Sequence, residues 1–485
     1  MMKKNLLMSI GALLGMWIAA VTSSWPIEVS KEYAGSEKCS VCHFKIYDKW
    51  KTTLHSGIYL PPVPENVISN FSGDVTLSDS GKGIPATIFT LDNNGGNGPF
   101  TVTVKGQKFT VDRVHGGKPI AENEDPNSPN TPGKAKYIGK QRYQTKIGNN
   151  YVILPLQWNP IPDLDGKSSG WVSYNLQDWV DQQGNVKPKP ETKSEEQNCA
   201  GCHQTGVSVV FNDSAKLFEM AASEENIACE ACHGPGADHA ATADKMKIVN
   251  PNALIAWQQK TDVCGQCHSR IKSKEIIGGM TLSYAYANGR GFIPGDLLED
   301  FANDAGGYWN GGLSKQHHQQ HQDYVGHGEY MGSAHARAGM TCWSCHNPHG
   351  SDFEHDLVKS ARDNGLCLQC HAGKFPDNAA IENHSKHAVS NTASPKCIDC
   401  HMSAAQKSAV DYDIHQHSFR VLTPAQTLAF VQPNACALCH RSYQGVTDTN
   451  IAKWDEESDK VINTWLSEQF LTMFGYTNIN GWELY

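Results

Sequence analysis

The sequence lacks two features that would direct it to a membrane or to nucleic acid. After residue 24, no apolar run in the 485-residue chain reaches the length of about 20 residues that a bilayer span requires, so we expect a soluble mature protein. Lysine and arginine are not in excess either, because the formal net charge is −9. An acidic surface disfavours nucleic acids and anionic membranes as partners and favours cationic or docking proteins.

The sequence also has no spare cysteine. Its 16 cysteines all belong to eight Cys-x-x-Cys-His motifs, since 8 × 2 = 16, and this leaves none for a disulfide or a thiolate nucleophile. The motifs consist of Cys39, Cys42 and His43; Cys199, Cys202 and His203; Cys229, Cys232 and His233; Cys264, Cys267 and His268; Cys342, Cys345 and His346; Cys367, Cys370 and His371; Cys397, Cys400 and His401; and Cys436, Cys439 and His440.

Two thiols at this spacing can add to the two vinyl groups of one haem, and the adjoining histidine then binds its iron. A zinc site does not require histidine directly after the second cysteine, and a redox dithiol is expected once, beside a βαβ unit. Eight such motifs therefore predict eight covalently bound haem c groups. These haems would also add buried apolar surface to a chain in which only 39% of the residues are hydrophobic.

The N-terminus has the pattern of a secretory signal peptide. Lys3 and Lys4 precede a mostly apolar run from Leu6 to Val21, and small residues follow it. We therefore expect export to the periplasm or the extracellular space, where removal of both lysines would change the net charge from −9 to −11. An uncleaved N-terminal anchor is the alternative, because the cleavage site is not a clean Ala-x-Ala.

The cysteine spacing and composition divide the chain into seven segments. These are a signal peptide (1–24), a first haem segment (25–60), a β-rich insert (61–190), haems 2–4 (191–275), a His-rich connecting segment (276–340), haems 5–8 (341–442) and a C-terminal helix (443–485). The predicted fold class is mainly α, with extensive irregular structure organised around haems and a small antiparallel β-rich insert.

The insert contains runs that are rich in Thr, Val and Phe and separated by turn residues. They predict an antiparallel sheet from Ala86–Leu91, Phe100–Val104 and Lys108–Val114. A further hairpin is predicted between Arg142–Lys146 and Tyr151–Leu156. The insert is either a scaffold or a docking face for a partner.

Three helices are predicted outside the motifs. One runs over Ile46–His55, with the histidine near its end, and one closes the chain over Asp455–Phe474. A third is predicted over Lys315–Ala338, with His317, His321 and His335 on one face, although three glycines weaken it.

Fourteen histidines lie outside the motifs and can supply eight distal ligands. They are His55, His115, His239, His317, His318, His321, His327, His335, His349, His355, His384, His387, His415 and His417. Every iron could therefore be held by two histidines. A six-coordinate iron has no position for a substrate, so bis-His ligation points to electron transfer at low potential.

Several motifs and their flanking residues resemble a known family. Part of the chain resembles the tetrahaem cytochrome c that accepts electrons from hydroxylamine oxidoreductase, through Cys39–His43, Trp50–His55, Cys199–His203, Cys229–Gly236 and Cys264–His268. The second half resembles larger octahaem relatives of that superfamily through Gly339–His349, Cys397–Met402 and His417–Arg420.

The resemblance implies particular distal ligands. It makes His55 the distal ligand of the fourth haem and His239 that of the first. The candidates in the second half, without assigned haems, are His335, His349, His387 and His417. It also implies that the iron on His203 has an open position. The Cys-x-x-Cys-Lys motif of the related ammonia-forming nitrite reductases does not occur in this sequence.

Three functions are compatible with this sequence. The first is an electron carrier of the cell envelope, with a row of closely spaced, mostly bis-His haems. The second is a multihaem oxidoreductase that reduces or oxidises a small nitrogen or sulfur compound at one open haem. The third is a subunit of an extracellular haem filament. The expected partners are redox proteins, either cytochromes or a membrane quinol-oxidising complex; an oligomer is possible, and no catalytic residue is assigned.

Overall fold

A computed structural model describes most of the chain between residues 32 and 436. The described residues are 32–117, 140–148, 150–159, 170–187, 194–306, 324–326, 329–361, 363–389, 396–406, 414–430, 432–436, 464 and 466–469. Several predicted features lie outside them, namely the signal peptide, most of the C-terminal helix, His317, His318, His321, His327 and His440.

The described α-helices are short. Only α1 (Ser36–Trp50) and α6 (Trp257–His268) are longer than eight residues. The others are α2 (Glu195–Asn198), α3 (Ala200–His203), α4 (Cys229–His233), α5 (Ala237–Thr242), α7 (Leu298–Phe301), α8 (Ala334–Arg337), α9 (Gly365–His371), α10 (Asn378–Ser385), α11 (Cys397–His401) and α12 (Pro424–Phe430).

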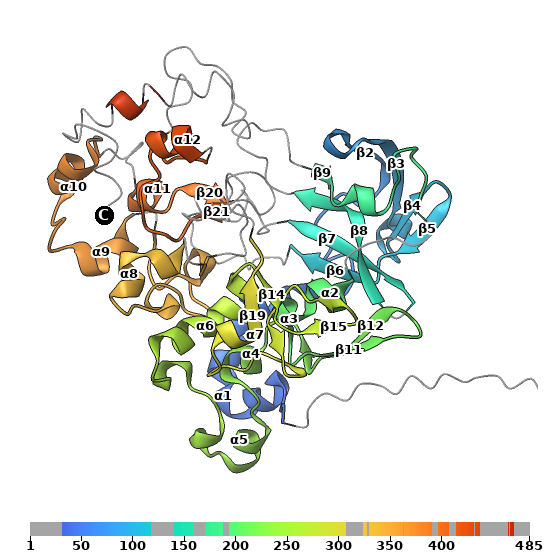
Figure 1. Cartoon of the computed structure of the whole chain (residues 1–485), viewed down its shortest axis with the longest axis horizontal. Coiled ribbons are helices and arrows are strands. Elements are labelled where there is room, and N and C mark those ends of the chain that lie inside the picture. The colour runs from blue at the N-terminus through green and yellow to red at the C-terminus, as the bar shows by residue number, and fades with distance from the viewer. Residues whose placement is uncertain are drawn as a thin grey trace, which may run out of the picture.

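Two antiparallel sheets form the insert, which lies at the upper right of Figure 1. The five-stranded sheet has the order β1 (Tyr59–Leu60), β6 (Arg113–Gly116), β7 (Gln141–Ile147), β8 (Asn150–Asn159) and β9 (Gly170–Ser173). The four-stranded sheet has the order β2 (Gly73–Asp79), β3 (Ile84–Asp92), β4 (Thr101–Val104) and β5 (Gln107–Thr110).

Outside the insert, the described residues form six two-stranded ribbons. They pair β10 (Gln204–Thr205) with β13 (Glu224–Glu225), β11 (Ser208–Asn212) with β12 (Leu217–Ala221), β14 (Ile271–Ser273) with β19 (Ala302–Asp304), β15 (Ile276–Ile277) with β16 (Met280–Thr281), β17 (Tyr286–Ala287) with β18 (Arg290–Gly291), and β20 (Ala404–Gln406) with β21 (Ile414–His415).

The predicted mainly-α fold class is therefore wrong. Among the described residues, short helices are mixed with many strands in several small antiparallel sheets. A Cys-x-x-Cys-His motif requires only about one helical turn, and α4 and α11 consist of nothing but the motif. The chain between motifs is then available for turns and ribbons, such as β11 with β12 between the second and third motifs.

The strand predictions in the insert hold in part. The predicted Ala86–Leu91 and Phe100–Val104 correspond to β3 and β4, which pair antiparallel. The predicted hairpin is confirmed, because β7 pairs antiparallel with β8. The predicted Lys108–Val114 is not one strand: its first part belongs to β5, and its last residues begin β6 in the other sheet.

The two insert sheets share one apolar core. Side chains of β3 alternate between buried and exposed over most of the strand, and its buried Phe89 belongs to the same cluster as Tyr143 and Leu154 of the second sheet. Phe71 joins the sheets further, since its ring centre is 4.9 Å from that of Tyr143. The insert can therefore present a fixed surface to the haem motifs beside it.

Two helix predictions need correction. The helix after the first motif begins at Ser36, includes the motif and ends at Trp50, so His55 lies beyond it in a short 3-10 turn (His55–Gly57). In the described part of Lys315–Ala338, a 3-10 turn at Tyr330–Gly332 precedes α8, which has only four residues. Gly332 and the Ser333 N-cap interrupt a continuous helix there.

Candidate haem-binding sites

Six motif histidines each face a second histidine from elsewhere in the chain. The distances between ring centres are 6.3 Å for His43 and His239, 6.1 Å for His233 and His349, 6.2 Å for His268 and His55, 6.4 Å for His346 and His417, 6.1 Å for His371 and His335, and 6.0 Å for His401 and His384.

This spacing fits two imidazoles bound to the same iron. Two metal–nitrogen bonds of about 2.0 Å on opposite sides of a metal place the ring centres roughly 6 Å apart. The residues present therefore fit a haem at each of these six motifs, where the group supplies reversible one-electron chemistry.

Hydrogen bonds to backbone carbonyls orient several of these rings. The Nδ1 atoms of His233, His346 and His401 lie 2.9, 2.9 and 3.2 Å from the carbonyl oxygens of Val249, His355 and Phe419. A carbonyl oxygen can only accept, so Nδ1 carries the proton and donates it. The lone pair is then on Nε2, which is the nitrogen that remains available for a metal.

Two of the facing histidines are oriented in the same way. His239 Nδ1 lies 3.0 Å from the carbonyl oxygen of Asp244, and His417 Nδ1 lies 3.1 Å from that of His415. Burial also lowers the pKa of His417 and of the motif residue His268 to about 3. The rings of His417 and His268 are therefore neutral at physiological pH, which is the state that binds iron.

The predicted distal histidines lie close to the motifs, with one exception. His55 and His239 face the histidines of the fourth and first motifs, as the resemblance implies. His335, His349 and His417 face the histidines of the sixth, third and fifth motifs. The sequence did not assign these three ligands to particular haems.

The exception concerns the seventh motif, because the histidine that faces His401 is His384 of α10, which the sequence did not single out as a distal ligand. The Nδ1 atom of His387 lies 2.6 Å from the carbonyl oxygen of Ser385. The two residues are only three apart, so sequence spacing alone could not distinguish them.

Cysteines of different motifs are in side-chain contact. The side chains lie close together in four pairs, namely Cys39 with Cys229, Cys202 with Cys267, Cys264 with Cys342, and Cys367 with Cys397. The first motif therefore lies against the third, the second against the fourth, the fourth against the fifth, and the sixth against the seventh. Cys345 also interacts electrostatically with Cys370, which relates the fifth motif to the sixth.

The second motif differs from the other six whose histidines are described. Among the described rings, His115 and Tyr59 contact His203, with ring centres 4.7 and 5.7 Å away. The spacing between the rings of His115 and His203 is too short for an iron between them. The Nδ1 atom of His203 is 3.2 Å from the phenol oxygen of Tyr59, where other motif histidines meet a carbonyl.

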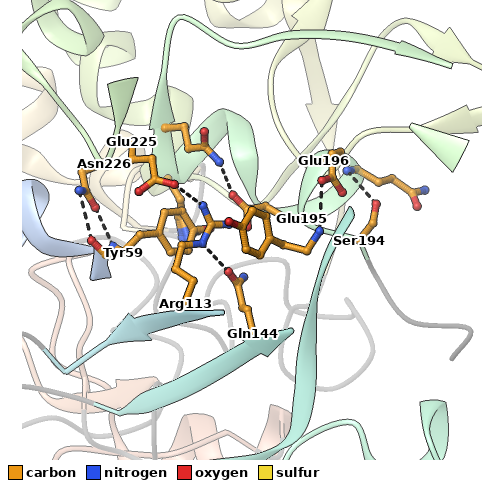
Figure 2. A network of polar contacts seen from close by, with 12 residues as sticks. Tyr59, Arg113, Gln144, Ser194, Glu195, Glu196, Glu225 and Asn226 are labelled. Carbon is orange, nitrogen blue, oxygen red and sulfur yellow. Dashed lines mark hydrogen bonds and ion pairs between the residues drawn. The ribbon is translucent and has the colours of Figure 1, made fainter. Parts of the chain in front are cut away.

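A network of charged residues attaches this motif to the insert (Figure 2). Arg113 of β6 is 4% exposed and forms ion pairs with Glu195, which lies in α2 directly before the motif, and with Glu225 at 2.8 Å. Its guanidinium carbon lies 3.9 Å from the ring centre of Tyr59 and 3.8 Å from that of Tyr151. The insert sheet is thus fixed to the second haem motif.

The surroundings of His203 carry positive charge. Burial, followed by the charges of Arg142, Lys140 and Arg113, lowers the pKa of His203 to about 4. The same influences hold the pKa of His115 well below its ordinary value. The sequence indicates His115 only as one possible ligand and indicates no role for the arginines. These residues come together only because β1 pairs with β6 and β6 with β7.

Two parts of the chain match known protein families. Residues 167–234 match the family cytochrome c554 and c-prime, and residues 335–375 match the doubled CXXCH motif family. These regions include the second, third, fifth and sixth motifs. Both families agree with covalent haem attachment through Cys-x-x-Cys-His.

Two known proteins are similar to the chain over longer stretches. The multihaem cytochrome MtrA of Shewanella baltica is 28% identical over 207 residues, which cover 40% of this chain and 56% of the relative. The crystal structure of the outer cell wall cytochrome OcwA matches with a TM-score of 0.55 and 19% identity, and covers 91% of this chain and 99% of that one. The likeness to OcwA concerns the fold alone.

The motifs, their facing histidines and these similarities are those of multihaem c-type cytochromes. The cofactor that the motifs and these similarities support is covalently bound haem c. The narrower placement among the relatives of hydroxylamine oxidoreductase stays a prediction. Among the described residues, no helix has the length and apolarity needed to cross a bilayer.

Proposed function

We propose that the protein is an octahaem electron carrier of the cell envelope. The observation that carries this proposal is the set of six histidine pairs with ring centres 6.0 to 6.4 Å apart, because such pairs leave no coordination position for a substrate. The proposed distal ligands are His239, His349, His55, His417, His335 and His384, for the first and for the third to seventh haems.

The envelope location is supported by the signal-like residues 1–24 and by the outer cell wall location in the name of OcwA. Electrons would enter from one redox protein and leave to another. The motif contacts through cysteines support rapid exchange between neighbouring haems, since covalent attachment fixes each porphyrin edge close to its own pair of cysteines.

The haem count tests the proposal directly. A pyridine haemochrome assay on the purified protein should give eight haems per 53.2 kDa chain, all resistant to acid-acetone extraction. Six or fewer would contradict the count, and extractable haem would contradict thioether attachment.

The distal ligands can be tested with a matched pair of variants. His384→Ala should convert one low-spin ferric haem to a high-spin haem, because it removes one of two axial ligands. Asn383→Ala, an exposed change next to it in α10, should leave the electron paramagnetic resonance (EPR) spectrum unchanged. If the two variants give the same spectrum, the assignment of His384 is wrong.

A second candidate function is reduction or oxidation of a small nitrogen or sulfur compound at the haem on His203. It is favoured by one observation, namely that no described histidine lies across from His203 at the spacing of the six pairs. EPR of the oxidised wild-type protein tests it. A high-spin haem supports this candidate, and an all-low-spin spectrum refutes it in favour of a pure electron carrier.

A further inference from the structure

One face of the insert sheet presents a row of polar side chains to the second motif. Tyr59 of β1 is directly opposite His115 of β6, and His115 is directly opposite Arg142 of β7. Directly opposite residues on neighbouring strands point to the same face of a sheet. This row meets His203 through the phenol of Tyr59 and the ring of His115.

Arg142 has no carboxylate partner among the described residues. Its Nε donates to the Oε1 atom of Gln157 at 2.8 Å, and its guanidinium carbon lies 3.7 Å from the ring centre of Tyr174. The side chains that interact with its charge are Tyr174, Cys199 and Tyr59. None of these three side chains is a carboxylate, so none supplies the counter-charge that an arginine usually has.

Arg113, the other arginine on this face of the sheet, is paired with carboxylates, as buried arginines usually are. Arg113, two residues before His115 on the same face of β6, has carboxylate partners in Glu195 and Glu225. A buried cation is normally paired in this way, because leaving it without a counter-charge is costly. Arg142, which is half-buried, is therefore an exception on the same face of the sheet.

His115 has an unused polar atom at the same place. The residue is only 8% exposed, and its Nδ1 has no hydrogen-bond partner among the described residues. A buried nitrogen without a partner costs free energy unless a ligand supplies one. Lys140, next to the start of β7, adds positive charge to the same surroundings.

We propose that Arg142 and His115 form an anion-binding site beside the haem motif Cys199–His203, and that its ligand is an oxyanion. A guanidinium recognises a carboxylate or another planar oxyanion through charge-assisted hydrogen bonds. The ligand is either a propionate of the haem itself or a small free oxyanion that reaches this haem. The inference rests on the proposed attachment of a haem at this motif.

The experiment compares the haem-loaded wild-type protein with Arg142→Gln, Arg142→Lys and Arg290→Gln. Arg290 is the matched control, since it is more exposed and already paired with Asp296 at 2.7 Å. Oxidised protein is titrated with sodium nitrite or sodium sulfite against chloride at equal ionic strength, and the haem spectra are recorded. A redox titration of every haem follows without added oxyanion.

Two results support the site and distinguish the sources of the ligand. A free oxyanion gives a saturable spectral change that weakens about tenfold or more in Arg142→Gln, recovers in part in Arg142→Lys and persists in Arg290→Gln. A propionate gives no such response, but Arg142→Gln then lowers the potential of one haem, because a nearby positive charge is lost. Arg142→Lys restores that potential in part.

The inference is overturned if Arg142→Gln matches the wild type in both titrations. It is likewise overturned if Arg290→Gln reproduces every change. Failure of the proposed function is recognised separately, by mass spectrometry of the peptide that contains Cys199–His203. If that peptide carries no haem in the wild-type protein, the haem assignment fails before the anion site is tested.

Discussion

At the residue scale, the phenol of Tyr59 sets the second haem motif apart. It occupies the position next to His203 Nδ1 where His233, His346 and His401 have backbone carbonyls. A phenol oxygen accepts a hydrogen bond less strongly than an amide carbonyl does, and the guanidinium of Arg113 over its ring withdraws further electron density. The imidazole of His203 is therefore a weaker electron donor than those of the other motifs.

Replacing this acceptor should change one redox potential. In Tyr59→Phe, the buried Nδ1–H of His203 loses its partner, so the ring donates less to the ferric state and the potential of a single haem should rise. Spectroelectrochemical titration of all haems measures the change. Tyr151→Phe is the matched control, because Tyr151 stacks on the same arginine without contacting His203. A fall in potential, or an equal shift in the control, would contradict this role.

At the element scale, α4 holds the N-terminus of α1 through one carboxylate. Glu230 lies between the two cysteines of the third motif and is 2% exposed. Its oxygens accept the backbone N–H groups of Ala34 and Gly35 at 2.8 Å each and of Gly236 at 2.7 Å. The first and third motifs are thus joined by side-chain to backbone bonds as well as by the contact of Cys39 with Cys229.

Glu230→Gln should loosen this junction without changing its shape. One of the three N–H groups would then face an amide NH2 group and lose its acceptor. A buried donor without an acceptor lowers the free energy of unfolding by about 1–3 kcal/mol. Amide hydrogen exchange at the start of α1 should accelerate by about tenfold or more. Asp48→Asn, an exposed change near the C-terminus of α1, should leave exchange at the start of the helix unaltered. Equal exchange rates in both variants would show that Glu230 does not hold the helix.

The sequence predicts single strands and hairpins better than it predicts which distant strands pair with one another. The hairpin of β7 and β8 was predictable because β-forming residues flank a Gly-Asn-Asn turn. The division of Lys108–Val114 between two sheets could not be predicted. The local alternation of apolar and polar residues does not specify which strands pair. The same limit applies to the site: haem attachment follows from motif spacing, whereas the row of Tyr59, His115 and Arg142 exists only through strand pairing.

At the scale of the whole molecule, the cysteine contacts arrange the motifs in a branched row. Cys39 and Cys229 join the first motif to the third, while Cys264 and Cys342 join the fourth to the fifth. Cys232 interacts with Cys264, which relates the third motif to the fourth. The second motif meets the fourth through its own cysteine and so forms a side branch. The fourth haem is therefore the expected junction between both halves of the chain.

A change of ligand at this junction should slow electron exchange between the halves. Methionine in place of a distal histidine raises a haem potential, so His55→Met should make the fourth haem a trap for electrons. Stopped-flow reduction should then show one rapid phase and one delayed phase, where the wild type shows a single equilibrating phase. His384→Met places the same trap at the seventh haem, beyond the junction, and should not delay exchange between the third and fifth haems. If both variants show the same kinetics, electrons do not pass through the fourth haem, and the branched row does not describe their path.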